Sequence, residues 1–416
     1  MSKACFLLCS VIALPGLANG VVDNITVDPS ARWRFQNVND SLQGDAQAHT
    51  LMLRLTATSN VTPSLTGMIQ TDYVYAFNRG NYSDGVVRRD AAFIPDPQGV
   101  DLNQLWLSYQ LHWGADITLG RQQLSVDNER HLGGNSFWQN EQTFDALLYK
   151  QSWLNGLKIR YTYINQVNRI FGRDADAQLQ TDDIRFDDFS TRPAIEQGVH
   201  KHNSHLFDVA FEINNSLKIA GFLYSLDNQT FNGFSSHTLG VVATGRLKPD
   251  TIRYDYRVET AIQTDAYDSS WDYQATYIAI NVSAQHKSHR FELGYENIGQ
   301  DNGFGFVHSL GSNHQFNGWA DIFAQYNKPE GIADTFIMYR GRSGKLRWRA
   351  KIHQYQSADH KLDVGKELNV ELAYRASIKW ELSAAFARYK PDSGFESLAE
   401  SQVPRTTGFV SVKYQL

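Results

Sequence analysis

Apolar and polar residues alternate along this chain in short segments, and the alternation is clearest over residues 406–416. Successive side chains of a strand point to opposite faces, so this segment has one apolar face and one polar face. The apolar face holds Val410, Val412, Tyr414 and Leu416, and the polar face holds Ser411, Lys413 and Gln415. The last strand of a closed barrel in lipid pairs with the first strand and turns one face to hydrocarbon. The pattern therefore predicts a transmembrane β-barrel.

Similar segments recur throughout and predict about eighteen antiparallel strands in one closed sheet. Boundaries drawn from sequence err by about 2–4 residues, so sixteen strands is the alternative. An even number of strands places both termini in the periplasm. The predicted strands cover residues 31–38, 49–58, 64–76, 102–112, 115–124, 143–150, 157–165, 204–213, 216–226, 236–247, 251–263, 271–285, 289–298, 332–341, 345–357, 367–377, 379–389 and 406–416.

The connections between these segments alternate in length. Short, turn-like sequences such as 112–114 (HWG) and 248–250 (KPD) alternate with much longer segments. Bacterial barrels have short periplasmic turns and longer extracellular loops, so we expect the long connections on the cell surface. No linker, composition break or internal repeat indicates a second domain. The long connections are residues 77–101, 166–203, 299–331 and 390–405.

Composition agrees with a barrel. The chain has 416 residues, a net charge of −5, 30 Gly and 12% aromatic residues. Beyond the N-terminal segment, no apolar run reaches the roughly 20 residues of a spanning helix. Aromatic girdles and a polar lumen explain why the chain is both rich in aromatics and polar on average. A pair of soluble β-sandwiches is the alternative, but it does not explain the bare apolar strand at residues 406–416.

The N-terminal segment has the pattern of a secretory signal peptide. It contains one basic residue, then an apolar run too short to span a membrane, then small residues suited to cleavage. We therefore expect residues 1–20 to be a signal peptide and residues 21–416 to form a single outer-membrane β-barrel domain. Both cysteines, Cys5 and Cys9, lie in the signal peptide. The mature chain is thus expected to have neither a disulfide nor a cysteine nucleophile.

Several blocks of sequence follow one another in an order that is specific as a set. They are residues 120–124 (GRQQL), 127–130 (DNER) with Gly133, 138–146 (WQNEQTFDA), 316–323 (FNGWADIF), 331–334 (GIAD) and the strand pair within 365–389. Together they resemble the alginate export family of outer-membrane β-barrels, and they cover most of the mature chain. The resemblance implies an eighteen-stranded barrel that passes polysaccharide or oligosaccharide, in the best-known members anionic alginate.

The resemblance also marks individual positions. Gln139 stands where the family is expected to have Arg, so the resemblance implies that one cationic contact of the pathway is absent here. The last strand resembles the segment that outer-membrane proteins present to the insertion machinery. It ends in Leu416, where those proteins usually end in Phe. The motif residues that the resemblance carries over are Arg121, Arg130, Asp145, Trp319 and Asp321.

Alternation also predicts which charged side chains face the lumen. A charge in the lipid-facing row costs about 2–4 kcal/mol at the membrane midplane, so the apolar residues decide the register. The inward basic residues are Arg32, Arg34, Arg54, Lys158, Arg160, Arg253, Arg257, Arg347, Arg349 and Lys351. The inward acids are Asp72, Glu292, Glu296, Glu367 and Glu371. Because the bases outnumber the acids and Arg binds carboxylates through a planar fork, we predict an anion-selective lumen. Charge ladders that only hold the wall are the alternative.

Arg121 is an exception to this rule. Ile117 and Leu119 place it on the lipid face, unless a bulge or the end of the strand intervenes.

Other patterns indicate no separate site. Aspartates crowd residues 173–203, and His200, His202 and His205 follow, but the spacing does not match an EF-hand loop. Strand geometry puts His205 on the face opposite the other two histidines, so no metal site is predicted. The Ser204–His205 neighbours likewise point to opposite faces and give no nucleophile–base pair, which argues against an enzyme. Adhesion would need larger folded loops.

The sequence predicts a passive outer-membrane channel for anionic saccharides, either an alginate-like polymer or uronate oligosaccharides. A general or differently selective porin is the runner-up, because fold alone does not decide the substrate. The expected partners are outer-membrane lipid, the saccharide and the barrel-insertion machinery. We expect no nucleic acid, no cofactor and no metal, and a monomeric protein.

One loop has a different periodicity. Within residues 299–331, Phe316, Trp319, Ile322 and Phe323 recur at helix-like spacing. A large apolar patch seldom faces water. We therefore predict that this loop folds inward or packs across the extracellular mouth, with Asn317 and Asp321 on its polar side. A rim loop packed only against its neighbours is the alternative.

Overall fold

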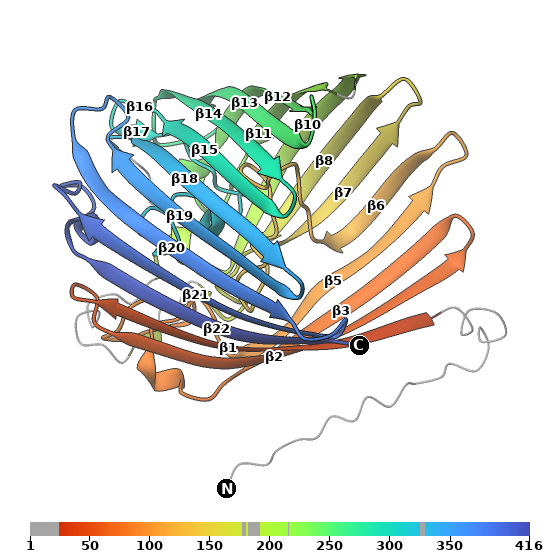
Figure 1. Cartoon of the computed structure of the whole chain (residues 1–416). Coiled ribbons are helices and arrows are strands. Elements are labelled where there is room, and N and C mark those ends of the chain that lie inside the picture. Colours follow the sequence, from red (N-terminus) through yellow and green to blue (C-terminus); the bar gives the residue numbers. More distant parts are fainter. Residues whose placement is uncertain (1–24, 177–179, 182–191, 215, 325–328) are drawn as a thin grey trace, which may run out of the picture.

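The chain forms one closed β-barrel (Figure 1). The structure, a computed structural model, describes residues 25–176, 180–181, 192–214, 216–324 and 329–416. The predicted signal peptide lies outside the described residues.

Eighteen antiparallel strands make the wall, which confirms the predicted fold class. Each strand pairs with its neighbours in the chain, and β1 pairs with β22 from Ser30↔Gln415 to Asp40↔Arg405, which closes the sheet. Closure leaves no unpaired edge, as lipid requires. The wall strands are β1 (Ile25–Asp40), β2 (Ala46–Thr62), β3 (Leu65–Ala76), β5 (Gly99–Gln110), β6 (Ala115–Gln122), β7 (Thr143–Ser152), β8 (Leu157–Asn168), β10 (Val199–Asn214), β11 (Leu217–Leu226), β12 (Ser236–Leu247), β13 (Ile252–Asp265), β14 (Gln274–His286), β15 (His289–Ile298), β18 (Ile332–Ser343), β19 (Leu346–Gln356), β20 (Asp363–Arg375), β21 (Trp380–Pro391) and β22 (Arg405–Gln415).

The remaining elements are short and lie in the loops. Among the described residues, no helix is long and apolar enough to cross a bilayer. The short strands are β4 (Val87–Arg88), β9 (Gln180–Thr181), β16 (Gln300–Asp301) and β17 (Phe304–Gly305). The 3₁₀ turns are η2 (Arg79–Asn81), η4 (Ala194–Glu196), η5 (Asn232–Phe234), η6 (Asn313–Gln315) and η7 (Ala399–Gln402).

The two ends of the barrel differ in the length of their connections. Tight turns join the strands at the end where both termini of the wall lie, as between β14 and β15 at residues 287–288. Bacterial barrels keep such turns in the periplasm, so the opposite end is extracellular. The long extracellular connections are residues 77–98, 123–142, 169–198, 299–331 and 392–404; the second of these was not among the long loops that the sequence predicted.

Strand alternation gives the wall an apolar outer surface. Leu119, Leu293 and Ile337 are exposed by 61%, 57% and 61% of their surface, as lipid-facing residues should be. On the last strand Val410 points outward, whereas its neighbour Phe409 is buried inside. Near the periplasmic end, the rings of Trp380 and Tyr414 lie 4.8 Å apart on the outer face.

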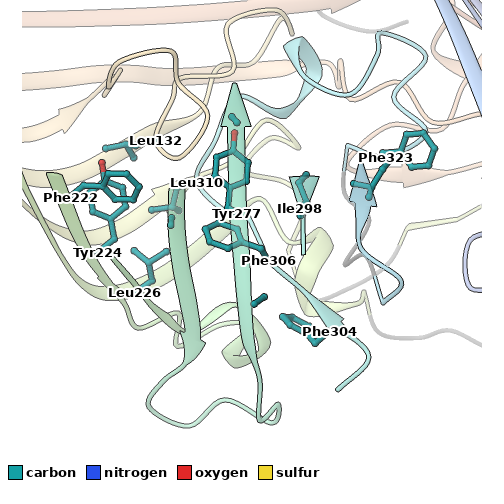
Figure 2. Packing of buried hydrophobic residues seen from close by; sticks show 14 of the residues in the cluster. Leu132, Phe222, Tyr224, Leu226, Tyr277, Ile298, Phe304, Phe306, Leu310 and Phe323 are labelled. Atoms are coloured by element: carbon teal, nitrogen blue, oxygen red, sulfur yellow. The ribbon is translucent and has the colours of Figure 1, made fainter. Parts of the chain in front are cut away.

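The interior is not an open tube. Two clusters of buried apolar residues join the inner wall to the loops that fold into the barrel. In Figure 2, Leu132 and Leu310 of two such loops lie among wall residues that include Phe222 and Tyr277. Loop residues therefore occupy much of the lumen.

Candidate functional site

Two extracellular loops meet inside the barrel. Residues 123–142 connect β6 to β7, and residues 299–331 connect β15 to β18. The Gly133 amide donates to the Leu310 carbonyl at 3.0 Å. The side-chain amide of Gln142 donates to the Gly133 carbonyl at 3.0 Å and to the Leu310 carbonyl at 2.9 Å. Buried backbone groups need such partners, so these bonds join the two loops into one constriction.

A buried polar network ties this constriction to the wall. Arg130 Nε donates to Glu296 Oε1 at 2.7 Å, and Arg130 Nη2 donates to Asn317 Oδ1 at 2.8 Å. Its guanidinium also lies over the Phe316 ring, 4.6 Å from the ring centre. Asn317 donates in turn to Glu296 and to Asp334, at 2.6 Å and 3.3 Å. Arg130, which the resemblance marked, is therefore the link between both loops and β15.

The start of the 123–142 loop reaches the opposite wall. Asp127 pairs with Arg257 at 2.6 Å, and His131 Nε2 lies 2.6 Å from Glu259 Oε1. Asn128, between them, borders two cavities of about 270 and 410 Å³. The start of this loop thus lies between two cavities of the lumen.

A third loop, residues 77–98, holds Arg34. Arg34 Nη1 donates to Asp96 Oδ2 at 3.0 Å, and the Tyr82 hydroxyl donates to the Asp96 carbonyl at 3.0 Å. Burial raises the pKa of the Tyr82 hydroxyl well above its ordinary value, so this group stays a neutral donor. The Arg34 guanidinium also lies against the rings of Phe137, Trp138 and Phe409. Arg34 is only 3% exposed, so it anchors loops and does not line the open lumen.

Gln139 occupies a site that suits an amide better than a guanidinium. Arg32 Nε donates to Gln139 Oε1 at 2.8 Å, and the Gln139 amide donates to Thr50 Oγ1 at 2.9 Å. An Arg at this position would offer no acceptor and would place two cations together. Gln139, at the position where the resemblance led us to expect Arg, therefore supplies the acceptor that Arg32 needs.

The ten basic residues predicted for the lumen all lie on the interior face, but most are paired. Eight of them bind carboxylates, which is the wall-ladder arrangement weighed as the alternative. Arg32 instead contacts Gln139 and main-chain carbonyls, and Lys351 lies 3.7 Å from the centre of the Phe336 ring. The ion pairs are Arg34–Asp96, Arg54–Asp72, Lys158–Glu212, Arg160–Asp208, Arg253–Asp255, Arg257–Glu259, Arg347–Glu381 and Arg349–Glu371.

A row of arginines crosses one wall of the lumen. The strand register places Arg253, Gln285, Arg290, Arg340 and Arg349 directly side by side on β13, β14, β15, β18 and β19. Like charges in directly opposite positions destabilise a sheet. Arg290 and Arg340 were not assigned to the lumen from the sequence. Their apolar neighbours on the strands, Phe291 and Tyr339, could have indicated that both arginines face inward.

Arg340 is the least compensated member of this arginine row. Arg290 binds Asp255 and Glu292 at 2.7 and 3.2 Å, and Arg349 binds Glu371 at 2.9 Å. Arg340 is exposed to the lumen, and no ion pair found among the described residues includes it. The row, apart from Arg253 and Gln285, borders the cavity of about 410 Å³. An anion in this cavity would meet a guanidinium that is free to bind it.

Aromatic residues of the 299–331 loop line the same cavity. Trp319 is buried, and the Arg349 guanidinium lies 4.4 Å from its ring centre. Asp321 lies 2.9 Å from His314 Nδ1 within the loop. Of the two motif residues in this loop, only Trp319 borders the cavity of about 410 Å³.

The 299–331 loop folds inward, as one of the two predicted arrangements required, but it is not helical. The apolar segment, residues 316–323, has irregular backbone, with positive φ at Asn317, Gly318 and Asp321. A Cβ on Gly318 would lie 2.3 Å from Glu367 Oε2. Close packing on the wall, not a helix period, therefore explains the spacing of its aromatic residues. Asn317 is buried and does not lie on a polar outer side.

The motif residues Arg121 and Asp145 lie outside the lumen. The register puts Arg121 beside Asp145 and opposite the outward-facing Leu105. The two side chains form a double hydrogen bond at 2.6 and 2.8 Å. Arg121 also donates to the Leu102 carbonyl at 3.2 Å, beyond the last β5–β6 pair. The extracellular end of the strand thus accommodates the charge, and neither residue can touch a solute inside.

The histidines near residue 200 form no common site. His200 and His202 are buried inside, whereas His205 is exposed on the outer face beside Tyr161. Asp182, Asp183, Asp187 and Asp188 of the preceding loop lie outside the described residues. Within the part of the chain that the structure describes, no group of three His, Cys, Asp or Glu side chains is arranged to hold a metal ion.

No model of a known protein family matches the chain, and no curated protein matches its sequence. Solved structures match it over almost its whole length. OccAB2 of Acinetobacter baumannii is 12% identical, with 95% of this chain and 98% of that chain covered and a TM-score of 0.71. OpdK of Pseudomonas aeruginosa, solved with vanillate, is 13% identical, with 95% and 100% covered and a TM-score of 0.70. OccK9 (OpdG) of P. aeruginosa is 14% identical, with 95% and 99% covered and a TM-score of 0.69.

These neighbours are outer-membrane porins of the Occ/OprD type. At such low identity the likeness establishes the fold, a closed eighteen-stranded barrel, and no substrate. The barrel and its apolar outer surface place the protein in the bacterial outer membrane. The neighbours are not alginate exporters, although those proteins share the strand number. The resemblance to the alginate export family therefore stays a prediction.

Proposed function

We propose that this protein is a passive channel for small carboxylated solutes, with short uronate oligosaccharides as the preferred class. The row of arginines on β13, β15, β18 and β19 carries the proposal. Three of its members bind carboxylates, and the fourth, Arg340, presents to the lumen a guanidinium for which the described residues supply no ion pair, in a protein whose net charge is −5. Porins without an energy source follow the gradient of the solute, so the direction of transport is set outside the protein.

The chemistry of this wall suits carboxylates. A guanidinium presents paired donors in a fixed fork that matches the two oxygens of a carboxylate. Arg340 has no carboxylate of the described chain to satisfy it, so a solute carboxylate can take that place. Neighbouring Arg290 and Arg349 already bind carboxylates of the protein, which leaves Arg340 as the donor for the solute.

The shape of the cavity suits a ring-sized solute. Its volume of about 410 Å³ lies in the range of small-molecule sites. Phe316, Trp319 and Phe336 give it apolar faces on which a sugar or aromatic ring can pack. The two inward loops fill much of the remaining lumen. This favours short oligosaccharides over an alginate-like polymer, the other substrate that the sequence predicted.

A general or differently selective porin is the second candidate. OpdK was solved with vanillate, an aromatic carboxylate, and the same arginines and aromatic faces would receive such a solute. Competition separates the two. A uronate disaccharide and vanillate, added in turn at equal concentration to single channels in a planar bilayer, should interrupt the current with different dwell times. Longer interruptions by the disaccharide support the uronate class, and longer ones by vanillate support the aromatic class.

The charge requirement has its own test. Arg340→Gln should lower the anion-to-cation permeability ratio, measured as the reversal potential in a salt gradient, and should shorten the dwell time of either solute. Lys248→Gln, in a periplasmic turn, removes the same charge outside the lumen and serves as the control. An unchanged ratio in Arg340→Gln would reduce the arginines to wall ladders and end the proposal.

A further inference from the structure

The outer face of the barrel carries a basic patch on two neighbouring strands. The outward-facing residues of β20 run from Lys366 through Leu368 towards the periplasm, and those of β21 end with Arg388 and Lys390. Lys366, Arg388 and Lys390 are all exposed. Charges are rare on the lipid-facing rows of such a wall, because they cost free energy unless they lie near the membrane interface.

Two positive charges of the patch lie directly opposite each other. Lys366 lies directly opposite Lys390, and Leu368 lies directly opposite Arg388. Residues directly opposite each other in an antiparallel pair have Cβ atoms about 4.5–5.5 Å apart, and like charges there are destabilising. Such a local conflict in an otherwise consistent strand pair points to a functional role.

Carboxylates of the protein do little to relieve this repulsion. Lys366 Nζ lies 3.7 Å from Asp392 Oδ2, in an ion pair that is largely exposed. Exposed pairs of this kind contribute little. Among the described residues, no ion pair includes Arg388 or Lys390. Uncharged polar neighbours complete the surroundings, with Gln354 beside Lys366 and Thr406 beside Arg388. The patch therefore offers donors to an external anion.

Its height on the wall indicates what that anion is. β20 begins and β21 ends at the extracellular end of the barrel, so the three cations lie at the level of the outer lipid headgroups. Leu368 lies beside Arg388 and below Lys366, and Phe386 lies below Arg388; they are exposed by 41% and 42% on the lipid-facing rows. A ligand that uses both surfaces has anionic headgroups above and acyl chains below.

We propose that Lys366, Arg388 and Lys390 form a binding site for a phosphorylated glycolipid of the outer leaflet. Each ammonium and the guanidinium bind phosphate oxygens, and the acyl chains cover Leu368 and Phe386. Bound phosphate offsets the repulsion between Lys366 and Lys390. This site is on the outer wall, and it is independent of the solute pathway inside the barrel.

Native mass spectrometry of the full-length protein in detergent micelles tests the site. The probes are diphosphorylated lipid A, dephosphorylated lipid A and phosphatidylglycerol. Wild-type protein should retain diphosphorylated lipid A most tightly. Lys366→Gln with Arg388→Gln and Lys390→Gln should weaken that binding about a hundredfold, since each basic residue near an anionic lipid surface contributes roughly fivefold. Lys366→Arg with Lys390→Arg should keep it.

The control variant removes three exposed charges from the periplasmic turns. It combines Lys248→Gln, Lys379→Gln and Lys287→Asn, the last because Asn tolerates the positive φ of residue 287. It should bind diphosphorylated lipid A as the wild type does. Heat-dependent gel migration verifies that every variant is folded. Equal binding by the patch variant, equal loss in the control, or equally tight binding of phosphatidylglycerol would each overturn the proposal.

Discussion

Breaking the contact between Arg130 and Glu296 should loosen the constriction without unfolding the barrel. Arg130 is 2% exposed and holds Glu296, Asn317 and the Phe316 ring at once. Removing one partner of a buried ion pair costs about 3–5 kcal/mol, because the other charge stays behind without it. The wall depends on its strand ladders and not on this contact.

This free-energy cost should be visible in the single-channel current. A loss of about 3 kcal/mol shifts the equilibrium between a docked and a released loop by more than a hundredfold. Arg130→Met should therefore convert a steady single-channel current into flicker between two conductance levels. The upper level corresponds to the released loop of residues 123–142. Arg246→Met breaks an exposed ion pair with Asp255 and should leave the current steady.

A double-mutant cycle decides whether the pair itself is responsible. Glu296→Gln alone leaves Arg130 buried without a carboxylate, whereas Arg130→Met with Glu296→Gln leaves neither charge. The double variant should therefore flicker less than the sum of the two single effects requires. Strictly additive effects, or a steady single level in Arg130→Met, would refute the reasoning.

Three further changes test other parts of the structure. Gly318→Ala should release the 299–331 loop and raise mean conductance, because its Cβ would lie 2.3 Å from Glu367 Oε2 and its φ is +89°; unchanged conductance would mean that the loop does not narrow the pore. Gln139→Arg should lower stability in urea by about 1–3 kcal/mol, because Arg32 would lose its buried acceptor; an unchanged urea midpoint would contradict the role given to Gln139. Ile337→Arg should cost about 2–4 kcal/mol in lipid vesicles if this residue faces the midplane, and no cost would place it off the lipid face.

The sequence was a good guide to the wall. Each of the eighteen predicted segments corresponds to one strand, and the observed ends lie within six residues of the predicted ones, some beyond them and some short of them. The outward rows were also predictable, as Leu119 and Val410 show. Neighbouring strands pair along the chain, so the order of segments already specifies which of them lie side by side.

The sequence was a poor guide to the charges inside. It assigned Arg160 and Arg349 to the interior but did not show that Asp208 and Glu371 bind them. Such pairs depend on the register between strands, which shifts with every bulge. It also left the position of Arg121 open, since only the end of β6 decides that this residue meets Asp145 on the outer side.

The amino-acid sequence by itself determined the barrel, because alternation with a period of two and a requirement to satisfy every backbone group in lipid leave few other folds. Only the tertiary structure decided the constriction. Arg130 and Asn317 lie far apart in the chain, in loops without a repeating pattern, and they meet because the closed wall brings both loops into one lumen. The arginine row has the same origin: its members come from separate strands, and register alone brings them side by side.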